Sequence, residues 1–386
     1  MQEKLMRPRK TMITGLLVIT AIGIGSALWL QKDKPNLKLQ ADFPLMGLLK
    51  TSAEAFTQVE APWQFSFPRD HSAHPHYQTE SWYFTGSLDS KQGKRFGFQL
   101  SFFRVGLKPP KTAHRPSLWD TREVYRGHFS LTDINQSHFQ VSERFSRSAL
   151  KLSGSSLYPP KIWLENWYFQ ALEGENSNSF HLQATAHNMR IDLTLHNLKP
   201  PFLSGQDPAK QRSTFYAYQL PRLRAQGKVQ INQNTYPVEG LAWLDHAWGA
   251  IPIPTGPVVW DRFLLQLEDG RDLLGFRLRR RDGSGVPINS GFLIDQNGKI
   301  QILDRDNFTI EVLNYWQSPS SKINYPSRWQ LRVPDQGLDL SLIPYVNNQE
   351  LNLTLRYWGG IVKATGKDYG ETVEGQGYIE LIGYDP

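Results

Sequence analysis

The sequence predicts an all-β protein made of two antiparallel units, each a sandwich or a barrel. Apolar and polar residues alternate with a period of two in one segment after another, which is typical of half-buried strands. The 30 Gly and 25 Pro residues separate these segments with turns, and no convincing helical pattern appears after residue 60. A chain of 386 residues is long enough for two such units.

Two segments of the first half show the alternation most clearly. In "FGFQLSFF" (96–103), the apolar side chains at 96, 98, 100 and 102 share one face, and small or polar residues occupy the other. The segment "FHLQATAHNMRIDLTLHNL" (180–198) predicts a hairpin whose apolar residues also share a face. Both patterns favour strands with one buried side.

The second half repeats this style with clear turn signals. Asp269-Gly270 and Asn297-Gly298 each separate two apolar runs, and the Asn-Gly pair is a strong type I′ hairpin signal. The stretch "PRLRAQG" (221–227) suggests a break. We therefore expect one domain over residues 61–225 and another over 226–386.

The N-terminus predicts a membrane anchor. Residues 11–30, "TMITGLLVITAIGIGSALWL", carry no charge and would span a bilayer as a helix. Residues 1–36 would form a basic cytoplasmic stub plus this anchor, and 37–60 a linker. The basic flank would stay inside, placing the rest in the periplasm or extracytoplasmic space. The alternative is a cleaved signal that releases a secreted protein.

Composition excludes several classes of function. The chain has no cysteine, which rules out disulfides, thiolate zinc sites and a cysteine nucleophile. The net charge of +7 is concentrated at the N-terminus. The basic run "RLRRRD" (277–282) is typical of a solvated strand end. Nucleic acid is therefore not an expected partner. Nucleophile-elbow, phosphate-loop, zinc-protease and dinucleotide-binding motifs are absent.

The stretch "FPRDHSAHPHYQTESWYFTG" (67–86) concentrates histidines and carboxylates before an aromatic strand. On an extended chain His74 and His76 share a face, which is a possible metal-ligand pair. The alternative is a polar barrel mouth that leads into a pocket wall. No second ligand pair is evident, so we expect a polar mouth and no metal.

A second constellation is "WLDHAWG" (243–249). On a strand His246 and Trp248 share one face, while Asp245 lies on the other unless a bulge intervenes. The alternative to a functional role is a buried histidine bonded to a backbone carbonyl beside packing tryptophans. "VVWDRF" and "LRYWGG" add further aromatic and carboxylate neighbours.

These motifs, with "FPRDH-x-x-H-P", "E-x-WY-x-TG" and the closing "GQGYIELIGY", follow one another in the order seen in one family. From about residue 62 onward the chain resembles the carotenoid 1,2-hydratase/AttH-like family. The resemblance implies two lipocalin-like (calycin-type) antiparallel β-barrels in tandem and usually export. It also implies a hydrophobic small molecule as ligand, with components of an ABC transporter as possible partners.

The resemblance also implies a site. His246 and Trp248 would act with Asp245 as their carboxylate, and Asp261 is added as a second acid from its position in the chain alone. The expected ligand-binding residues are the aromatic and polar residues around these motifs: His71, His74, Glu80, Trp82, Tyr83, Trp243, Trp260, Tyr357 and Trp358. Hydration of an alkene by a buried acid, a base and aromatic faces requires no cofactor.

The chain departs from the family pattern at three places. Ser81 stands where an aromatic residue is usual, and Ala247 and Gly359 stand where acidic residues are usual. The missing carboxylates favour a carrier of an isoprenoid or lipid-like molecule that assists a transporter. The retained Asp245, His246 and Trp248 favour the alternative, a hydro-lyase that adds water to an isoprenoid double bond.

Overall fold

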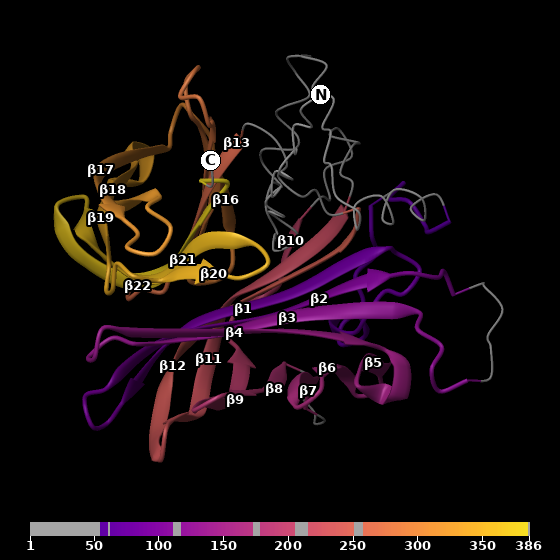
Figure 1. The fold of residues 1–386 in the computed structure, drawn as a ribbon. Coiled ribbons are helices and arrows are strands. Elements are labelled where there is room, and N and C mark those ends of the chain that lie inside the picture. Colours follow the sequence, from indigo (N-terminus) through magenta and orange to yellow (C-terminus); the bar gives the residue numbers. More distant parts are fainter. Residues whose placement is uncertain are drawn as a thin grey trace, which may run out of the picture.

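The protein is described by a computed structural model over residues 55–60, 62–110, 117–172, 178–204, 215–250 and 258–384. Over these residues the chain is all-β, and helical structure is limited to the 3-10 turns η1 (Arg69–His71), η2 (Ala149–Lys151) and η4 (Pro334–Gln336). The strands form two antiparallel sheets that curl beside each other (Figure 1). The predicted all-β class is therefore confirmed.

The first sheet is a barrel. Its strand order is β4-β3-β2-β1-β12-β11-β9-β8-β7-β6-β5, with β10 paired to β11. The end strands β4 and β5 contact each other, which closes the curl. Its strands are β1 (Thr79–Ser90), β2 (Arg95–Gly106), β3 (Glu123–Asp133), β4 (His138–Arg147), β5 (Ser153–Leu157), β6 (Pro160–Leu164), β7 (Trp167–Ala171), β8 (Ser179–Ala186), β9 (Met189–Asn197), β10 (Phe202–Ser204), β11 (Phe215–Ile231) and β12 (Asn234–Gly249).

The second sheet is a half-barrel with the order β16-β15-β14-β13-β22-β21-β19-β18-β17, and β20 pairs with β21. Figure 1 shows it curling above the first sheet, with β17 to β19 at the far left. Its strands are β13 (Val258–Leu267), β14 (Asp272–Arg280), β15 (Ile288–Ile294), β16 (Ile300–Leu303), β17 (Thr309–Gln317), β18 (Asn324–Val333), β19 (Leu338–Pro344), β20 (Glu350–Asn352), β21 (Arg356–Asp368) and β22 (Glu371–Ile382).

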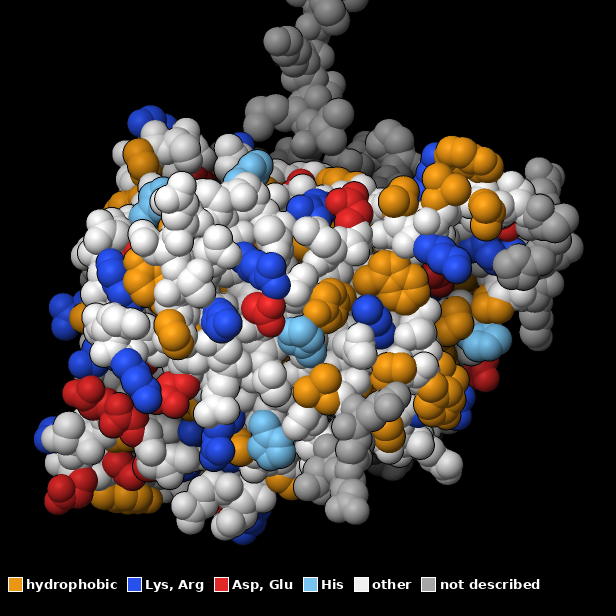
Figure 2. Space-filling model, turned by 90° about the horizontal axis from the view of Figure 1, so that it is seen from below, with side chains coloured by type: hydrophobic (Ala, Val, Ile, Leu, Met, Phe, Trp, Pro, Cys, Tyr) orange, Lys and Arg blue, Asp and Glu red, His pale blue; other side chains and the backbone are white. Residues whose placement is uncertain are grey.

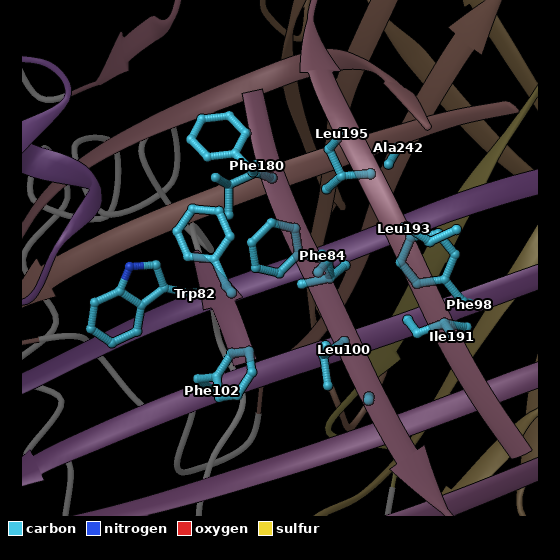
Figure 3. Packing of buried hydrophobic residues seen from close by; sticks show 14 of the residues in the cluster. Trp82, Phe84, Phe98, Leu100, Phe102, Phe180, Ile191, Leu193, Leu195 and Ala242 are labelled. Atoms are coloured by element: carbon cyan, nitrogen blue, oxygen red, sulfur yellow. The ribbon is translucent and has the colours of Figure 1, made fainter. Parts of the chain in front are cut away.

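The interior of the barrel is filled by the alternating apolar residues of its strands. The even-numbered positions of β1, β2 and β8 meet the odd-numbered positions of β9 in one cluster (Figure 3). The labelled members are Trp82, Phe84, Phe98, Leu100, Phe102, Phe180, Ile191, Leu193, Leu195 and Ala242. The predicted faces of segments 96–103 and 180–198 are thus confirmed, because burying one face of each strand removes apolar area from water.

Strands β1 and β12 separate the barrel interior from the second sheet. They pair without a break in register from Thr79↔Gly249 to Ser90↔Val238. Their other face packs on the second sheet through a separate apolar cluster, which includes Tyr83, Trp243, Leu264 and Tyr378. Where β1 and β12 are buried, successive residues therefore face the barrel interior and the second sheet in turn.

The division between the sheets differs from the predicted one. The predicted boundary at residue 225 lies inside β11, and the change of sheet comes between β12 and β13. At Leu220 to Leu223 the pairing of β11 with β12 shifts register. Pro221 therefore marks a β-bulge inside a strand pair, where a proline can be accommodated.

Two further expectations concern a turn and the N-terminus. The hairpins at 269–270 and 297–298 form, but only Gly298 of the Asn-Gly pair has positive φ, so this turn is not type I′. The predicted anchor at 11–30 lies outside the described residues. Within them, no helix has the length and apolar character needed to cross a membrane.

Candidate functional site

The mouth of the barrel is covered by the mouth segment, residues 62–78, which precedes β1. Its Trp63, Phe65 and Phe67 pack against the barrel core. Its 3-10 turn is fixed by Asp70, whose Oδ2 accepts hydrogen bonds from Trp63 Nε1 at 2.9 Å and Ser66 N at 2.8 Å. The histidine-rich stretch of the sequence therefore folds over the end of the barrel.

The register of β1 and β12 brings the second motif under this segment. Trp82 pairs with His246, and Glu80 pairs with Trp248. Since these four residues have the same parity, all of them point into the barrel. Glu80 and His246 have no exposed surface, and His74 of the mouth segment is 9% exposed.

Glu80 is the centre of a buried polar cluster. Its Oε1 accepts from His74 Nδ1 at 2.7 Å and from His246 Nε2 at 2.9 Å. Its Oε2 accepts from the backbone N of His74 at 2.8 Å and from Arg104 Nε at 3.1 Å. Asp70 Oδ1 lies 3.4 Å from His74 Nε2. We call His74, Glu80, Arg104, His246 and Asp70 the inner cluster.

The two histidines of the inner cluster have opposite electrostatic environments. Burial lowers the pKa of His74, but the carboxylates of Glu80 and Asp70 outweigh it and raise that pKa above its usual value. For His246 burial dominates over the attraction of Glu80 and lowers the pKa. Burial would raise the pKa of Glu80, yet His74 and Arg104 hold it well below its usual range. At pH 6.5, between the raised pKa of His74 and the lowered pKa of His246, the cluster therefore contains mainly charged His74, neutral His246 and the carboxylates of Glu80 and Asp70.

The hydrogen bonds fix the tautomer of His246. A carboxylate oxygen only accepts, so His246 Nε2 carries the hydrogen and Nδ1 carries the lone pair. That buried Nδ1 has no hydrogen-bond partner among the described residues. An unpaired buried nitrogen next to an imidazolium is suited to proton transfer, because nothing competes for it.

Aromatic rings enclose both imidazoles. His74 stacks on Trp248 with ring centroids 3.8 Å apart and planes inclined by 4°, and His246 stacks on Trp82 at 4.7 Å. Trp63 meets Trp248 edge to face at 5.5 Å. These rings supply an apolar wall whose faces can stabilise a cation.

Six of the residues expected from sequence come together here: His71, His74, Glu80, Trp82, His246 and Trp248. His71 shares a 2.6 Å hydrogen bond with Tyr218 through its Nδ1. Burial, with a smaller contribution from nearby His246, lowers the pKa of His71 to about 3. His71 therefore stays neutral and lies beside the inner cluster without carrying charge.

The remaining expected residues of β1 and β12 face the second sheet, as their parity predicts. Asp245 accepts hydrogen bonds from Arg262 of β13 and from Trp243 Nε1. Arg262 also donates to Glu380 of β22 at 2.9 Å and lies over the ring of Tyr83. Asp245, Arg262 and Glu380 form what we call the outer cluster. Asp245 is therefore not the carboxylate partner of His246; Glu80 is.

The other expected residues belong to the second sheet. Asp261 of β13 accepts hydrogen bonds from the Arg277 guanidinium at 3.0 Å and from the Tyr384 hydroxyl at 2.5 Å. Trp260 packs with Tyr357 and Trp358 fills the core of the half-barrel. These positions lie apart from the inner cluster, because β13 and β21 are strands of the other sheet.

The sequence interpretation missed Arg104 and Asp70 as parts of the site. A signal for Arg104 was present, since it takes the next inward position after Phe96, Phe98, Leu100 and Phe102. An arginine on an apolar face needs a buried anionic partner. Asp70 carried no comparable signal, because its contacts depend on the path of the mouth segment.

The possible ligand pair of His74 and His76 does not form, since His76 is exposed. Ligand atoms of His74, Glu80 and His246 do lie within 4.8 Å of one another, and zinc accepts such donors. However, Arg104 already bonds to Glu80, and its positive charge opposes a cation. That a resident metal is absent stays a prediction.

The sequence profile of the AttH-like family matches residues 58–384. The chain belongs to the AttH-like family. It is similar to a dehydratase, asqC, of Emericella nidulans, with 20% identity over 274 residues that cover 67% of this chain and 76% of the relative.

Two solved structures share the fold. One is a candidate AttH from Nitrosomonas europaea, with a TM-score of 0.71, 24% identity and coverage of 86% of this chain and 100% of that one. The other is kievitone hydratase from Nectria haematococca, with a TM-score of 0.62, 13% identity and coverage of 85% and 95%. The predicted family and the tandem arrangement of curled sheets are thereby confirmed, while the carotenoid hydratase function remains an expectation.

Proposed function

We propose that the protein is a hydro-lyase that adds water to, or removes it from, a carbon–carbon double bond of a hydrophobic substrate at the inner cluster. The observation that carries the proposal is the unpartnered Nδ1 of neutral His246 beside the charged His74, with Glu80 bonded to both. Addition of water requires a proton donor and a proton acceptor, and here His74 and His246 can have these roles while the Glu80 carboxylate holds both in place.

In the direction of hydration, His74 gives its proton to one alkene carbon. The oxygen of water bonds to the other carbon, and the proton that this water loses passes to His246 Nδ1. The product is the alcohol, with one water added. His74 is then neutral and His246 is charged on both ring nitrogens, and proton exchange with water during product release returns both imidazoles to their starting states.

The walls of the site suit this chemistry. Positive charge that develops on the substrate carbon would lie among the faces of Trp63, Trp82 and Trp248, where a cation is stabilised by roughly 0.5–2 kcal/mol. Burial excludes competing water. Since Glu80 and His246 are fully buried, the mouth segment must move to admit the substrate.

The relatives support the reaction class. One solved structure of this fold is named a hydratase and one similar sequence is named a dehydratase, and hydration and dehydration are opposite directions of the same type of reaction. An isoprenoid as substrate follows from the sequence resemblance alone. A carrier that assists an exporter is the second candidate, favoured by the missing carboxylates at Ala247 and Gly359.

Incubation with a panel of polyenes and allylic alcohols in D₂O tests the proposal. We expect products heavier or lighter by one water, with one carbon-bound deuterium after hydration. His246→Gln should lower turnover by about 10²–10⁴-fold, whereas His181→Gln, on the outer face of β8, should not. Binding of these compounds without any change in mass, across the panel, would support the carrier instead.

A further inference from the structure

A group of exposed apolar and basic residues lies beside the barrel mouth. Leu118 is 72% exposed, Trp119 63% and Leu150 43%. The amide of Leu150 donates to the carbonyl of Leu118 at 2.9 Å, and the Arg147 guanidinium lies 5.7 Å from the ring centre of Trp119. With Lys151 these five residues form what we call the rim patch.

The rim patch is at the same end of the barrel as the mouth segment. The loop that carries Trp119 joins the end of β2 to the start of β3, where Leu107 N donates to Arg122 O. One residue earlier, Gly106 N donates to Gln78 O of the mouth segment. In Figure 2 hydrophobic side chains gather toward the right-hand end of the molecule, the end where β5 lies in Figure 1.

The charges of the rim patch are positive and available. Arg147 and Lys151 form no ion pair with a carboxylate of the described residues. Leu150 and Lys151 both have positive φ, 55° and 58°, a conformation that costs free energy in residues with a Cβ. Such a turn keeps the leucine at the surface rather than in the core.

The first described residues lie at this end. Phe56 packs at Gly106, and Thr57 N donates to His76 O of the mouth segment. The uncharged stretch 11–30 lies upstream, separated by residues 31–54. If that stretch spans a bilayer, its tether attaches to the fold at the mouth and not at the second sheet.

We propose that the rim patch docks on the surface of a lipid bilayer that contains anionic headgroups. Tryptophan favours the membrane interface, leucines can enter its apolar region, and unpaired basic residues attract anionic lipids. Docking would face the mouth of the barrel toward the compartment in which an apolar ligand dissolves. The proposal holds for an enzyme or a carrier, so it does not depend on the hydro-lyase reaction.

The absence of cysteine allows a direct test on the full chain. Leu118→Cys and Tyr315→Cys each accept a single nitroxide label, and Tyr315 is an exposed residue of β17 in the second sheet. Each protein is placed in phosphatidylcholine vesicles with and without about 30% phosphatidylglycerol, at low ionic strength because salt screens the attraction. Collision of each label with a water-soluble nickel chelate and with oxygen is then measured by electron paramagnetic resonance.

We expect the label at 118 to be several-fold less accessible to the nickel chelate in the anionic vesicles than the label at 315. Adding Arg147→Glu and Lys151→Glu to the Leu118→Cys protein should restore its access. Equal access at 118 and 315 in anionic vesicles would overturn the proposal. So would protection at 118 that appears only when other proteins are added, since that would indicate a protein partner.

Discussion

Neighbouring residues of β12 lie in two different electrostatic environments. His246 points into the barrel and belongs to the inner cluster, where its Nδ1 has no partner among the residues that the structure describes. Asp245 points toward the second sheet and belongs to the outer cluster, where Arg262 bridges it to Glu380. Two adjacent, fully buried titratable residues can therefore have separate roles, because successive side chains of a strand point to opposite faces of the sheet.

In the outer cluster, burial and the positive charge of Arg262 shift the pKa of Asp245 in opposite directions. Burial raises the pKa of Asp245 to about 6, since the attraction of Arg262 only partly offsets it. Arg262 comes from β13 and Glu380 from β22, so the cluster ties β12 of the barrel to the half-barrel. We interpret the outer cluster as structural and the inner cluster as the site of chemistry.

Removing the central cation should break the outer cluster with the largest effect on stability. In Arg262→Met two carboxylates are left buried without a cationic partner, which should lower the free energy of unfolding by about 3–5 kcal/mol. Denaturant unfolding followed by circular dichroism measures this loss. Arg332→Met, which breaks a largely exposed pair with Glu311, should cost no more than about 1 kcal/mol. Equal losses in the two variants would contradict the structural role.

The pH dependence of turnover should sharpen the interpretation of the inner cluster. The reaction requires His74 charged and His246 neutral, so activity should rise through the lowered pKa of His246 and fall through the raised pKa of His74. The result is a bell-shaped profile whose optimum includes pH 6.5. In His74→Gln the remaining turnover should no longer fall at alkaline pH, so the profile should lose its alkaline limb. An unchanged alkaline limb in that variant would assign it to another group.

His71 provides a further effect, which concerns the dependence of stability on pH. Its pKa is about 3 in the folded protein and about 6.5 in an unfolded chain. Between these values the unfolded chain binds more protons, so acidification should lower stability by up to about 1.4 kcal/mol per pH unit from this group. His71→Asn should flatten the dependence of unfolding free energy on pH between about 6 and 4. The comparison is His138→Asn, which removes an exposed histidine of the same sheet.

Much of the fold could be predicted because apolar and polar side chains alternate along the strands. The faces of segments 96–103 and 180–198 and the opposite orientation of Asp245 and His246 all follow from a period of two. The domain boundary was misplaced because Pro221 and its neighbours can indicate either a linker or a bulge. The proline-rich "IPIPTGP" at 251–257, between β12 and β13, was the better signal.

The site could be predicted only in part. Motif residues on β1 and β12 meet because their strands pair, but the sequence does not state which strands pair. The resemblance therefore grouped Asp245, Trp260 and Tyr357 with His246, and Asp261 was added from its position in the chain. In the structure Asp245 faces away from His246, and the other three belong to the second sheet. Glu80 was expected in the pocket wall, and its position between two histidines depends on the register of β1 with β12.

The most direct test of the account compares His246→Gln with Asp245→Asn, two substitutions of adjacent residues on opposite faces. Turnover per folded molecule and the free energy of unfolding are measured for each. We expect His246→Gln to lose about 10²–10⁴-fold in turnover with a smaller loss of stability. Asp245→Asn should lose stability and keep turnover within a few-fold of the wild type. If Asp245→Asn abolished turnover in folded protein while His246→Gln preserved it, the inner cluster would not be the site of chemistry.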